Sequence, residues 1–466
     1  MKISGDNVLT QRMTATTMFF YLSIFITIVG CLYFYFTRTF NFWKIRNVKG
    51  PTPIPFFGNF IDVFFRRKHV GVLYSELYNQ YPNEKVVGLY RMTSPTLLIR
   101  DLDIVKQVLI KDFDSFPDRG LYYSKEQLGD NLFHSDVKVM KILRKHLTTV
   151  FTASKFKANF QVLAGRADKF VEYLENATLK DTEINTLPIF RKYGADSIMM
   201  GAFGIDIDPY NDDNDLCDLL DAAIQTPSYF LELELLFPGT LSKYNLSIFP
   251  KNVAKFCKQV IQAGTSLESV SKNERNITMD VLMSLRREGN LGSGKTVEEI
   301  DEVLRKHGGK FSYEALKEMK YLQMVFDETL RMHPLTNSVS RNVGRDIQLD
   351  GTDFVIDKNT IIAISPYAIQ HDEKYYPEPE QFKPERFSPE NVKERHPCAM
   401  VSFGLGPRSC LGSKFAQLQF GICMVKVFSK FRVECTKNTV DKITITPLRL
   451  LLTPKEKIYL RLVRRD

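Results

Sequence analysis

The sequence predicts a mainly α, α+β fold with small β-sheets, preceded by a single N-terminal transmembrane helix, and three observations support this prediction. An uncharged apolar run occupies residues 18–36. Between residues 101 and 330 the apolar residues recur mostly at helical spacing. Between residues 338 and 364 they form short runs rich in Val, Ile and Thr, interrupted twice by turn-forming residues. Segregated helices and small sheets favour this class over a doubly wound parallel sheet.

Composition sets the broad class of the protein. Of the 466 residues, 44% are hydrophobic and 25% are charged, which is close to the globular average and excludes a disordered, collagen-like or polytopic membrane protein. The net charge of +9 suits nucleic acid, anionic lipid or an acidic protein partner equally. The seven cysteines contain no CxxC pair, which favours a reducing compartment over a disulfide scaffold.

The N-terminal apolar run is long enough to cross a bilayer once. Its nineteen residues would span about 28 Å as a helix, close to the hydrocarbon thickness. The run exceeds the apolar core of a signal peptide and lacks a small-x-small cleavage site, so we expect an uncleaved anchor within residues 1–36. The positive-inside rule places the following side in the cytosol, because four basic residues follow the run: Arg38, Lys44, Arg46 and Lys49.

Residues 37–60 form a basic and proline-rich linker. Prolines fix φ and remove backbone donors, so Pro51, Pro53 and Pro55 predict a stiff, extended strap between the anchor and a single domain at residues 61–466. Trp43, the only tryptophan of the chain, suits the membrane interface.

The most informative segment is FGLGPRSCLG, residues 403–412. It places Cys410 between a glycine-rich turn and a helix-like run, where backbone N–H groups and the helix dipole favour the thiolate that binds a soft or redox metal. Gly404 and Gly406 permit positive φ and close approach of the backbone to a large flat ligand. Arg408 offers a cation to an anionic group of such a ligand. The apolar stripe of the following run is Phe415, Leu418, Ile422, Val425 and Phe428.

This segment resembles the haem-binding signature FxxGxRxCxG of the cytochrome P-450 family. The matching residues are Phe403, Gly406, Arg408, Cys410 and Gly412. The resemblance implies the cytochrome P-450 fold and bound haem b. It also implies that Cys410 is the axial thiolate ligand of the iron and that the other four residues contact the haem.

Two further segments resemble the same family in the same order. Glu328 and Arg331 in DETLRMHP match its ExxR pair, and at a spacing of three residues they share one helix face. Arg386 in FKPERF would complete a buried structural network with them. The resemblance extends over nearly all of the chain beyond residue 51. Within the family, the chain resembles insect xenobiotic-metabolising members of the microsomal class.

The resemblance also implies two haem-propionate contacts. Arg341 falls at one such position of the family, and Arg144 falls at the arginine of its WxxxR helix. The tryptophan of that motif is replaced here by Met140, so the usual donor is absent and only Arg144 can act.

The chain departs from the family between Ile300 and Asp301. There the family has a long apolar helix, whose AGx(D/E)T(T/S) motif carries an acid and an alcohol that guide protons during oxygen activation, followed by a shorter helix. Neither is present, and the nearest string, residues 262–266, lacks the acid. Loss of that helix would uncover the oxygen side of the haem and expose apolar surface. We therefore expect a poor or inactive catalyst, arising from a splice form or a gene-model error, with the oxygen-activating pair unassigned.

The resemblance implies a haem-thiolate monooxygenase that inserts one oxygen atom from O2 into an apolar small molecule, either a xenobiotic or an endogenous lipid or hormone. The substrate pocket is expected within residues 113–133 and 229–249, whose aromatic residues also suit a core or a membrane-facing surface. The protein is expected in the endoplasmic reticulum membrane, single-pass, with its catalytic domain on the cytosolic face.

Partners follow from the same resemblance. Electrons would come from an NADPH-dependent cytochrome reductase, with cytochrome b5 as a second candidate, and membrane lipid and the apolar substrate complete the set without nucleic acid. The reductase would dock on a basic face, for which the alternative is an ordinary solvated surface. The candidate lysines are Lys138, Lys141, Lys145 and Lys414.

Two other readings stay open. The string GNLGSGKT, Gly289 to Thr296, fits the phosphate-binding loop GxxxxGK[ST], but the charged and amphipathic segment before it does not resemble a buried strand. A non-catalytic haem-binding or partner-sequestering membrane protein is the second alternative, and the missing helix makes it physically reasonable.

Overall fold

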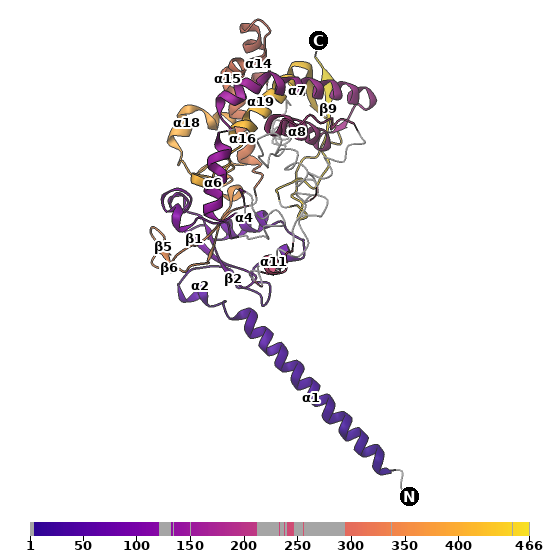
Figure 1. Ribbon diagram of the computed structural model, residues 1–466, viewed down its shortest axis with the longest axis vertical. Coiled ribbons are helices and arrows are strands. Elements are labelled where there is room, and N and C mark those ends of the chain that lie inside the picture. Colours follow the sequence, from indigo (N-terminus) through magenta and orange to yellow (C-terminus); the bar gives the residue numbers. More distant parts are fainter. Residues whose placement is uncertain are drawn as a thin grey trace.

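The computed structural model describes residues 4–120, 132–133, 135–149, 151–211, 240–246 and 294–465, without 337 and 450, together with residues 233, 237 and 255. Figure 1 shows a long helix, α1 (Ser4–Thr37), projecting from a body of helices and small sheets. Within α1, the 21 residues Thr17–Thr37 have a mean hydropathy of 2.0 and none is buried. The predicted apolar helix is thus present, and it is long and apolar enough to cross a membrane.

The segment after α1 packs onto the body instead of spanning a gap. It contains the short helices α2 (Phe42–Ile45) and α3 (Ile61–Phe64). Trp43 is only 2% exposed, and its indole N–H donates a hydrogen bond to the carbonyl of Leu89 at 2.8 Å. The expected position of Trp43 at the membrane interface is therefore wrong. Gly88 provides the space for the indole ring, because a Cβ there would lie 2.5 Å from Trp43 Cγ.

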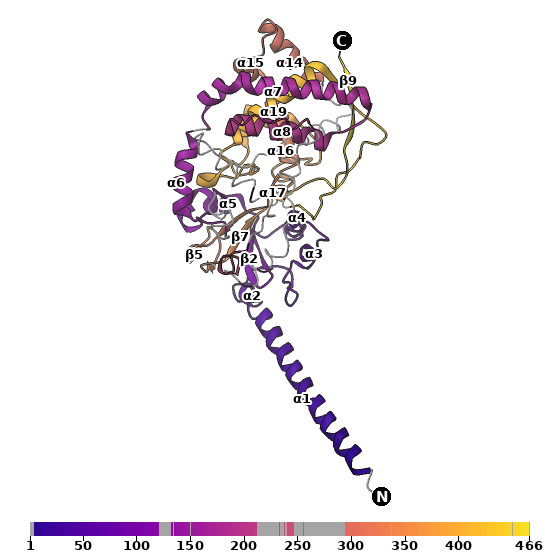
Figure 2. The same cartoon turned by 45° about the vertical axis from the view of Figure 1, so that its right-hand side comes forward.

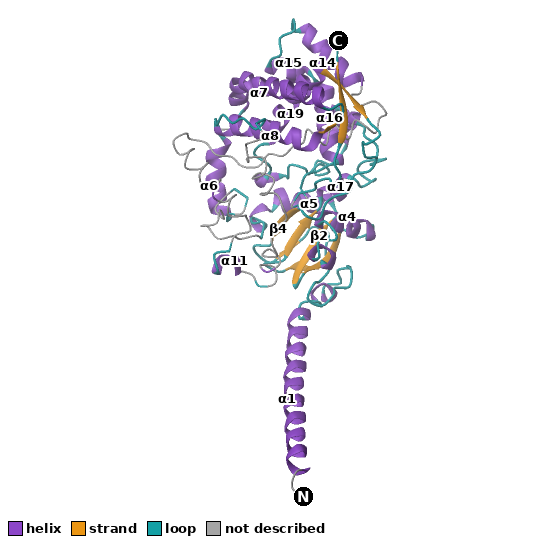
Figure 3. Cartoon of the chain, turned by 90° about the vertical axis from the view of Figure 1, so that its right-hand side faces the viewer, coloured by secondary structure: helices purple, strands orange, loops and turns teal. Residues whose placement is uncertain are grey.

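The main sheet lies next to the end of α1 (Figure 3) and has the strand order β1-β2-β7-β4. The β1–β2 hairpin is antiparallel, β2 pairs with β7 in parallel, and β4 pairs antiparallel with β7. Helices α4, α5 and α17 share one apolar core with it. The bounds are β1 (Val86–Arg91), β2 (Ser94–Ile99), β4 (Val339–Asn342), β7 (Ile361–Ile364), α4 (Val70–Gln80), α5 (Leu102–Lys106) and α17 (Pro366–Gln370).

The helical layer lies on the far side of the main sheet from α1 (Figure 2). Here α7 crosses α8 and α19, and α16 packs against α14 and α19 around a second apolar core. All five residues of the predicted apolar stripe are buried in α19. The bounds of these helices are α7 (Ala153–Lys180), α8 (Thr186–Phe203), α14 (Gly294–Lys306), α16 (Lys320–Met332) and α19 (Ser413–Lys430). Other helices of the body are α6 (Val137–Thr148), α15 (Tyr313–Glu318), α18 (Pro389–Glu394) and α11 (Thr240–Lys243), the last lying near the main sheet (Figure 1).

Small elements complete the described part of the chain. An antiparallel sheet of order β3-β9-β8 lies beside the helical layer, and β5 pairs with β6 in a hairpin. The predicted strands between residues 338 and 364 are thus confirmed as β4 to β7. The bounds are β3 (Ile184–Asn185), β5 (Ile347–Gln348), β6 (Val355–Ile356), β8 (Phe431–Cys435), β9 (Tyr459–Arg464), the π-helix η1 (Gln107–Lys111) and the 3-10 turns η2 (Phe113–Ser115), η5 (Pro384–Phe387) and η6 (Gly406–Arg408).

Candidate functional site

Cys410 lies in the loop between η6 and α19, three residues before the first residue of α19. Its backbone N–H donates a 2.7 Å hydrogen bond to the carbonyl of Phe403, which closes the loop on itself. At the next turn the N–H of Ala416 donates to the carbonyl of Gly412 at 2.9 Å, so Gly412 is the N-cap of α19. The thiol is partly exposed, in contrast to the buried thiols of Cys398 and Cys423. A loop held by backbone hydrogen bonds next to a rigid helix can present a sulfur ligand at a fixed position.

Two glycines shape this loop, as the sequence predicted. Gly404 and Gly406 have φ of 66° and 69°, in the left-handed region that favours glycine. A Cβ at Gly406 would collide with the carbonyl of Leu109 in η1. The backbone at Gly406 therefore lies close to the backbone of η1 and not to a ligand. This contact joins the cysteine loop to η1.

Arg144 and Arg408 hold the two sides of the loop. The Arg144 guanidinium donates to the carbonyl of Ser409 at 2.8 Å, so α6 is tied to the residue before Cys410. Arg408 is buried, and one of its Nη atoms lies 3.1 Å from the carbonyl of Ser135 and 3.4 Å from an oxygen of Asp118. Burial lowers the pKa of Arg144, and the negative charge of Cys410 opposes that effect.

Arg341 extends the positive charge to β4 of the main sheet. It is 1% exposed, and its Nε atom is buried without a hydrogen-bond partner among the described residues. Burial, followed by the positive charge of Arg408, lowers the pKa of Arg341 to about 10. A buried guanidinium with an unsatisfied N–H is costly unless a ligand completes its hydrogen bonds.

Arg119 is a member of the site that the sequence analysis did not identify. Burial, followed by the positive charges of Arg341 and Arg408, lowers the pKa of Arg119 to about 9, whereas the charge of Cys410 raises it. Its guanidinium stacks 3.8 Å from the ring of Phe133. It lies in an irregular loop without periodicity, so only its place in the segment DRGLYY could have marked it.

The arginines at this site fit the haem implied by the resemblance. Four of them interact electrostatically with one another or with the cysteine, and the carboxylate of Asp118 lies 3.4 Å from Arg408. Two further carboxylates, such as haem propionates, would neutralise this excess positive charge and satisfy the orphaned N–H of Arg341. The cluster consists of Arg119, Arg144, Arg341 and Arg408. Met140 is buried beside it on α6 and supplies no N–H donor.

Glu328, Arg331 and Arg386 come together in a buried network between α16 and η5. Arg331 donates to both oxygens of Glu328 at 2.7 and 2.9 Å, and both side chains are fully buried. Arg386 Nε lies 3.4 Å from Glu328, and the backbone N–H of Lys383 donates to Glu328 at 2.8 Å. Arg331 also donates to the carbonyl of Gln370 at 2.8 Å. These hydrogen bonds join three separate segments of the chain. The network therefore fixes the relative positions of the segments that support the cysteine loop.

The expected substrate pocket falls largely outside the described residues. Within the described part, Phe113 and Phe116 are buried, Phe116 in the core beneath the main sheet's helices, while Phe237 is exposed and stacks 6.2 Å from Tyr35 of α1. Residues 262–266 and 289–293 also lie outside the described residues. At the end of the proposed phosphate loop, Thr296 is fully buried in the first turn of α14.

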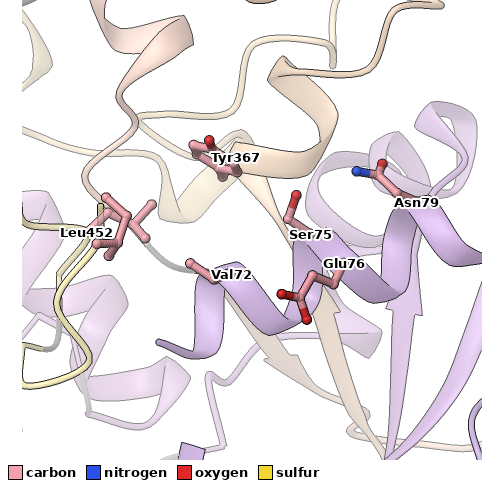
Figure 4. Close-up of a pocket in the computed structure, with 7 residues that line it drawn as sticks. Val72, Ser75, Glu76, Asn79, Tyr367 and Leu452 are labelled. Atoms are coloured by element: carbon pink, nitrogen blue, oxygen red, sulfur yellow. The ribbon is translucent and has the colours of Figure 1, made fainter. Parts of the chain in front are cut away.

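A pocket of about 140 Å³ lies between α4, α17 and the C-terminal segment (Figure 4). It is smaller than typical ligand pockets of roughly 300–1,000 Å³, and none of the predicted haem contacts lines it. The lining residues are Val72, Ser75, Glu76, Asn79, Tyr367, Ile445 and Leu452. We assign it no part in the site.

The four candidate docking lysines are all exposed. Three lie on α6 and Lys414 lies in the first turn of α19. The Arg144–Ser409 contact joins α6 to the loop that precedes α19 and contains Cys410. Lys141 lies 3.4 Å from Asp114, in an ion pair that is solvent-exposed and therefore weak.

Comparison with known proteins agrees with the family resemblance of residues 403–412. The family model described as cytochrome P450 matches residues 48–288 and 294–462. Cytochrome P450 6B2 of Helicoverpa armigera is 40% identical, over 96% of this chain and 99% of the relative. Cytochrome P450 6B1 of Papilio polyxenes is 39% identical over 96% of this chain and the whole relative, and cytochrome P450 6a2 of Drosophila melanogaster is 28% identical over the same shares.

The family match is interrupted at residues 289–293. The alignment with cytochrome P450 6B2 runs over 498 positions, more than the 466 residues of the chain, so it includes positions that this chain lacks. Helix α14 runs from Gly294 to Lys306 without a break at Ile300. The junction that the sequence analysis placed at Ile300 and Asp301 stays a prediction.

Proposed function

The chain belongs to the cytochrome P450 family, whose enzymes are haem-thiolate monooxygenases, and we propose that Cys410 is its thiolate ligand. When bound, haem supplies the oxygen chemistry, and the protein supplies ligation, orientation and a dry surrounding. The observation that carries the proposal is the partly exposed Cys410 next to a cluster of four arginines, of which Arg341 and Arg408 are buried. Arg119, Arg144, Arg341 and Arg408 would hold the propionates, with Phe403, Gly406 and Gly412 shaping the loop.

The residues around Cys410 have separable tasks in this proposal. Arg144 and the Phe403 carbonyl hold the loop on either side of the sulfur. Arg341 and Arg119 neutralise the carboxylates of the cofactor, which keeps it from leaving the site. No proton-transfer residue is assigned on the oxygen side, because the residues described there contain no acid and alcohol pair matching the family motif.

We further propose that the substrate is an apolar small molecule, a xenobiotic or an endogenous lipid or hormone. Electrons would arrive from an NADPH-dependent reductase that docks on the exposed lysines of α6 and α19, with cytochrome b5 as a second donor. Long-range attraction between such charges falls with ionic strength. Reduction of the haem by the reductase is therefore expected to slow in 0.5 M salt, and a rate insensitive to salt would support a merely solvated lysine face.

We place the protein in the endoplasmic reticulum membrane, anchored by α1 with its body in the cytosol. The support is the length and hydropathy of α1 and the basic residues that follow it. Flotation with vesicles after carbonate washing tests the anchor, and protease digestion of intact microsomes tests the side on which the body lies.

The interrupted family match supports slow turnover as a second element of the proposal. Without the helix that the sequence analysis finds missing, the oxygen side of the haem would lose its cover against water. The test compares this chain with a variant carrying the segment of cytochrome P450 6B2 between residues 288 and 294. We expect thiolate-ligated haem in both proteins and appreciable NADPH-dependent oxidation only in the variant.

The alternative of a non-catalytic haem-binding protein is decided by the same pair of proteins. If the restored variant gains turnover while the present chain binds haem without turnover, the result favours a non-catalytic haem-binding role for the present chain. Equal turnover in both proteins refutes the impaired form. We expect a calorimetric titration with ATP or GTP to show no heat of binding. That result would exclude a phosphate-binding loop at Gly289 to Thr296.

A further inference from the structure

A cleft of about 570 Å³ lies between α7 and the loop of residues 204–210 that follows α8. Its volume falls within the roughly 300–1,000 Å³ of typical ligand pockets, unlike that of the pocket in Figure 4. Both helices belong to the helical layer (Figure 2), and none of the predicted haem contacts lines the cleft. The charged and aromatic side chains among its lining residues are Lys169, Glu172, Tyr173, Asp206, Asp208 and Tyr210.

One wall of the cleft is held from behind by a buried ion pair. Arg166 of α7 and Asp196 of α8 lie 3.4 Å apart, and their side chains are 7% and 0% exposed. The other Nη atom of Arg166 lies 2.6 Å from Asp206, and the Tyr210 hydroxyl donates to Asp196 at 3.3 Å. Contacts to buried charged groups thus hold two residues of the wall in place. A cleft with a fixed wall needs little rearrangement to receive a ligand.

Two tyrosines form an aromatic platform in the cleft. The ring centroids of Tyr173 and Tyr210 are 5.1 Å apart at an interplanar angle of 34°, and the ring of Phe170 packs 6.3 Å from that of Tyr210. The ammonium group of Lys192 lies 5.1 Å from the centroid of the Tyr173 ring. At this distance a cation is attracted by the negative face of an aromatic ring. The platform therefore already attracts one cation of the chain itself, and a cation with a flat apolar body suits it equally.

Carboxylates outnumber basic groups among the lining residues. Glu172, Asp206 and Asp208 accompany a single lysine, Lys169. Arg166 compensates the charge of Asp206. Glu172 is exposed, and its carboxylate belongs to no ion pair within the described ranges of the chain. The two remaining carboxylates exceed the lysine, so the cleft attracts a cation and repels an anion.

We propose that this cleft is a second ligand site, which binds an organic ammonium ion that carries an aromatic ring. The ring packs against Tyr173 and Tyr210, and the ammonium group lies near Glu172 and Asp208. Recognition of this kind combines ring packing, cation–π attraction and opposite charge. The ligand differs in chemistry from the apolar small molecule proposed as the substrate, and the proposal depends on neither the haem nor the membrane anchor.

The test titrates the full chain, with haem bound, with benzyltrimethylammonium chloride. This quaternary ion has no lone pair on nitrogen, so it cannot coordinate the haem iron. Tyr173→Trp places an indole in the cleft, and its emission should change saturably with the ion, over a constant background from the buried Trp43. Val392→Trp, at an exposed position of α18, serves as the control and should show no saturable change.

The charge of the ligand is tested with a neutral molecule of the same shape. Neopentylbenzene keeps the ring and the branched carbon skeleton of the ion but has no positive charge. Because the cation–π and ionic attractions are lost, neopentylbenzene should bind at least about tenfold more weakly than the ion in the Tyr173→Trp titration.

Three charge variants in the Tyr173→Trp background test the residues of the cleft. Glu172→Gln should weaken binding of the ion at least about threefold, whereas Glu302→Gln, at an exposed position of α14, should leave it unchanged. Lys192→Gln should tighten binding, because it removes the cation that competes for the ring at position 173. Unchanged or weaker binding in Lys192→Gln would contradict the proposed position of the ammonium group.

Two controls make a negative result decisive. Circular dichroism establishes that each variant is folded, and equilibrium dialysis measures binding of the same ion to the unmodified chain, where one ion per chain is expected. The proposal is overturned if the unmodified chain binds no ion, or if the emission of folded Tyr173→Trp does not respond. Equal affinities for the ion and neopentylbenzene, or for the ion in Glu172→Gln and Glu302→Gln, also overturn it.

Discussion

The guanidinium of Arg144 donates a 2.8 Å hydrogen bond to the carbonyl of Ser409, the residue immediately before Cys410. Through this bond helix α6 supports the loop that presents the thiol. The second Nη atom of Arg144 lies 3.3 Å from the Ser409 hydroxyl, so the contact is two-pronged. A partner that binds the lysines of α6 would therefore act on an element joined directly to the cysteine loop.

Arg119 is expected to retain the cofactor. Arg119→Gln removes one of four cations that face the proposed propionate position, and each charge-assisted hydrogen bond is worth about 1.5–3 kcal/mol. The rate of haem transfer to apomyoglobin should therefore rise by at least about tenfold. Arg67→Gln, at an exposed position remote from the cysteine loop, should leave that rate unchanged. Equal rates in Arg119→Gln and the parent would remove Arg119 from the site.

Glu328 is expected to be critical for folding. Glu328→Gln leaves the fully buried Arg331, and Arg386 beside it, without a compensating negative charge, which costs roughly 3–5 kcal/mol for a broken buried pair. The free energy of unfolding in urea, measured alongside haem content, tests this. Glu318→Gln breaks an exposed pair with Lys306 and should cost much less, because solvent screens exposed ion pairs. Similar losses for the two variants would contradict a structural role for the network.

His69 is expected to make stability depend on pH. Its Nδ1 accepts from the N–H of Gly71 at 3.0 Å, its Nε2 lies 3.1 Å from the Arg449 carbonyl, and burial lowers its pKa from 6.5 to about 4. The folded state thus favours the neutral ring, so this contribution to stability is complete above pH 6.5 and is lost as the pH falls toward 4. At pH 5 the loss is about 2 kcal/mol.

Urea unfolding at pH 7.5 and pH 5 measures the contribution of His69. His69→Gln should reduce the difference in unfolding free energy between the two pH values, whereas His146→Gln, at an exposed position on α6, should leave it unchanged. A parent-like pH dependence in His69→Gln would show that this ring does not titrate as described.

Gly406 is expected to tolerate no side chain. In Gly406→Ala the new methyl group meets the Leu109 carbonyl at a φ that only glycine adopts readily, so the loop must shift at a cost of about 1–3 kcal/mol. Unfolding free energy and haem content should both fall. Gly165→Ala, within α7 where a Cβ meets nothing within 4 Å, should instead stabilise the protein slightly. Unchanged haem content in Gly406→Ala would contradict the geometry of the loop.

Local patterns allowed much of this fold to be predicted. The apolar run of α1, the stripe of α19 and the short strands near residues 338–364 follow from hydrophobic periodicity and turn residues alone. The positions of Cys410 and its two glycines follow from the spacing of one decapeptide. Each of these features is encoded within a few consecutive residues.

Long-range contacts were beyond the sequence analysis. An aromatic residue beside an apolar helix suits a membrane interface, but Trp43 instead fills the space above Gly88, and that vacancy becomes visible only when β1 is placed next to α2. The parallel pairing of β2 with β7 joins segments more than 250 residues apart. Arg119 lies in an irregular loop, and only the convergence of three other arginines on it shows its importance.

Ligation of the haem iron by Cys410 can be measured in the difference spectrum of the reduced protein under carbon monoxide. We expect a red-shifted Soret band, typical of thiolate-ligated haem, in the parent chain and in Cys435→Ser, which removes an exposed thiol on β8. We expect loss of that band in Cys410→Ala. A parent chain that binds haem without the red-shifted band, or a Cys410→Ala variant that keeps it, would contradict the assignment of Cys410 as the ligand.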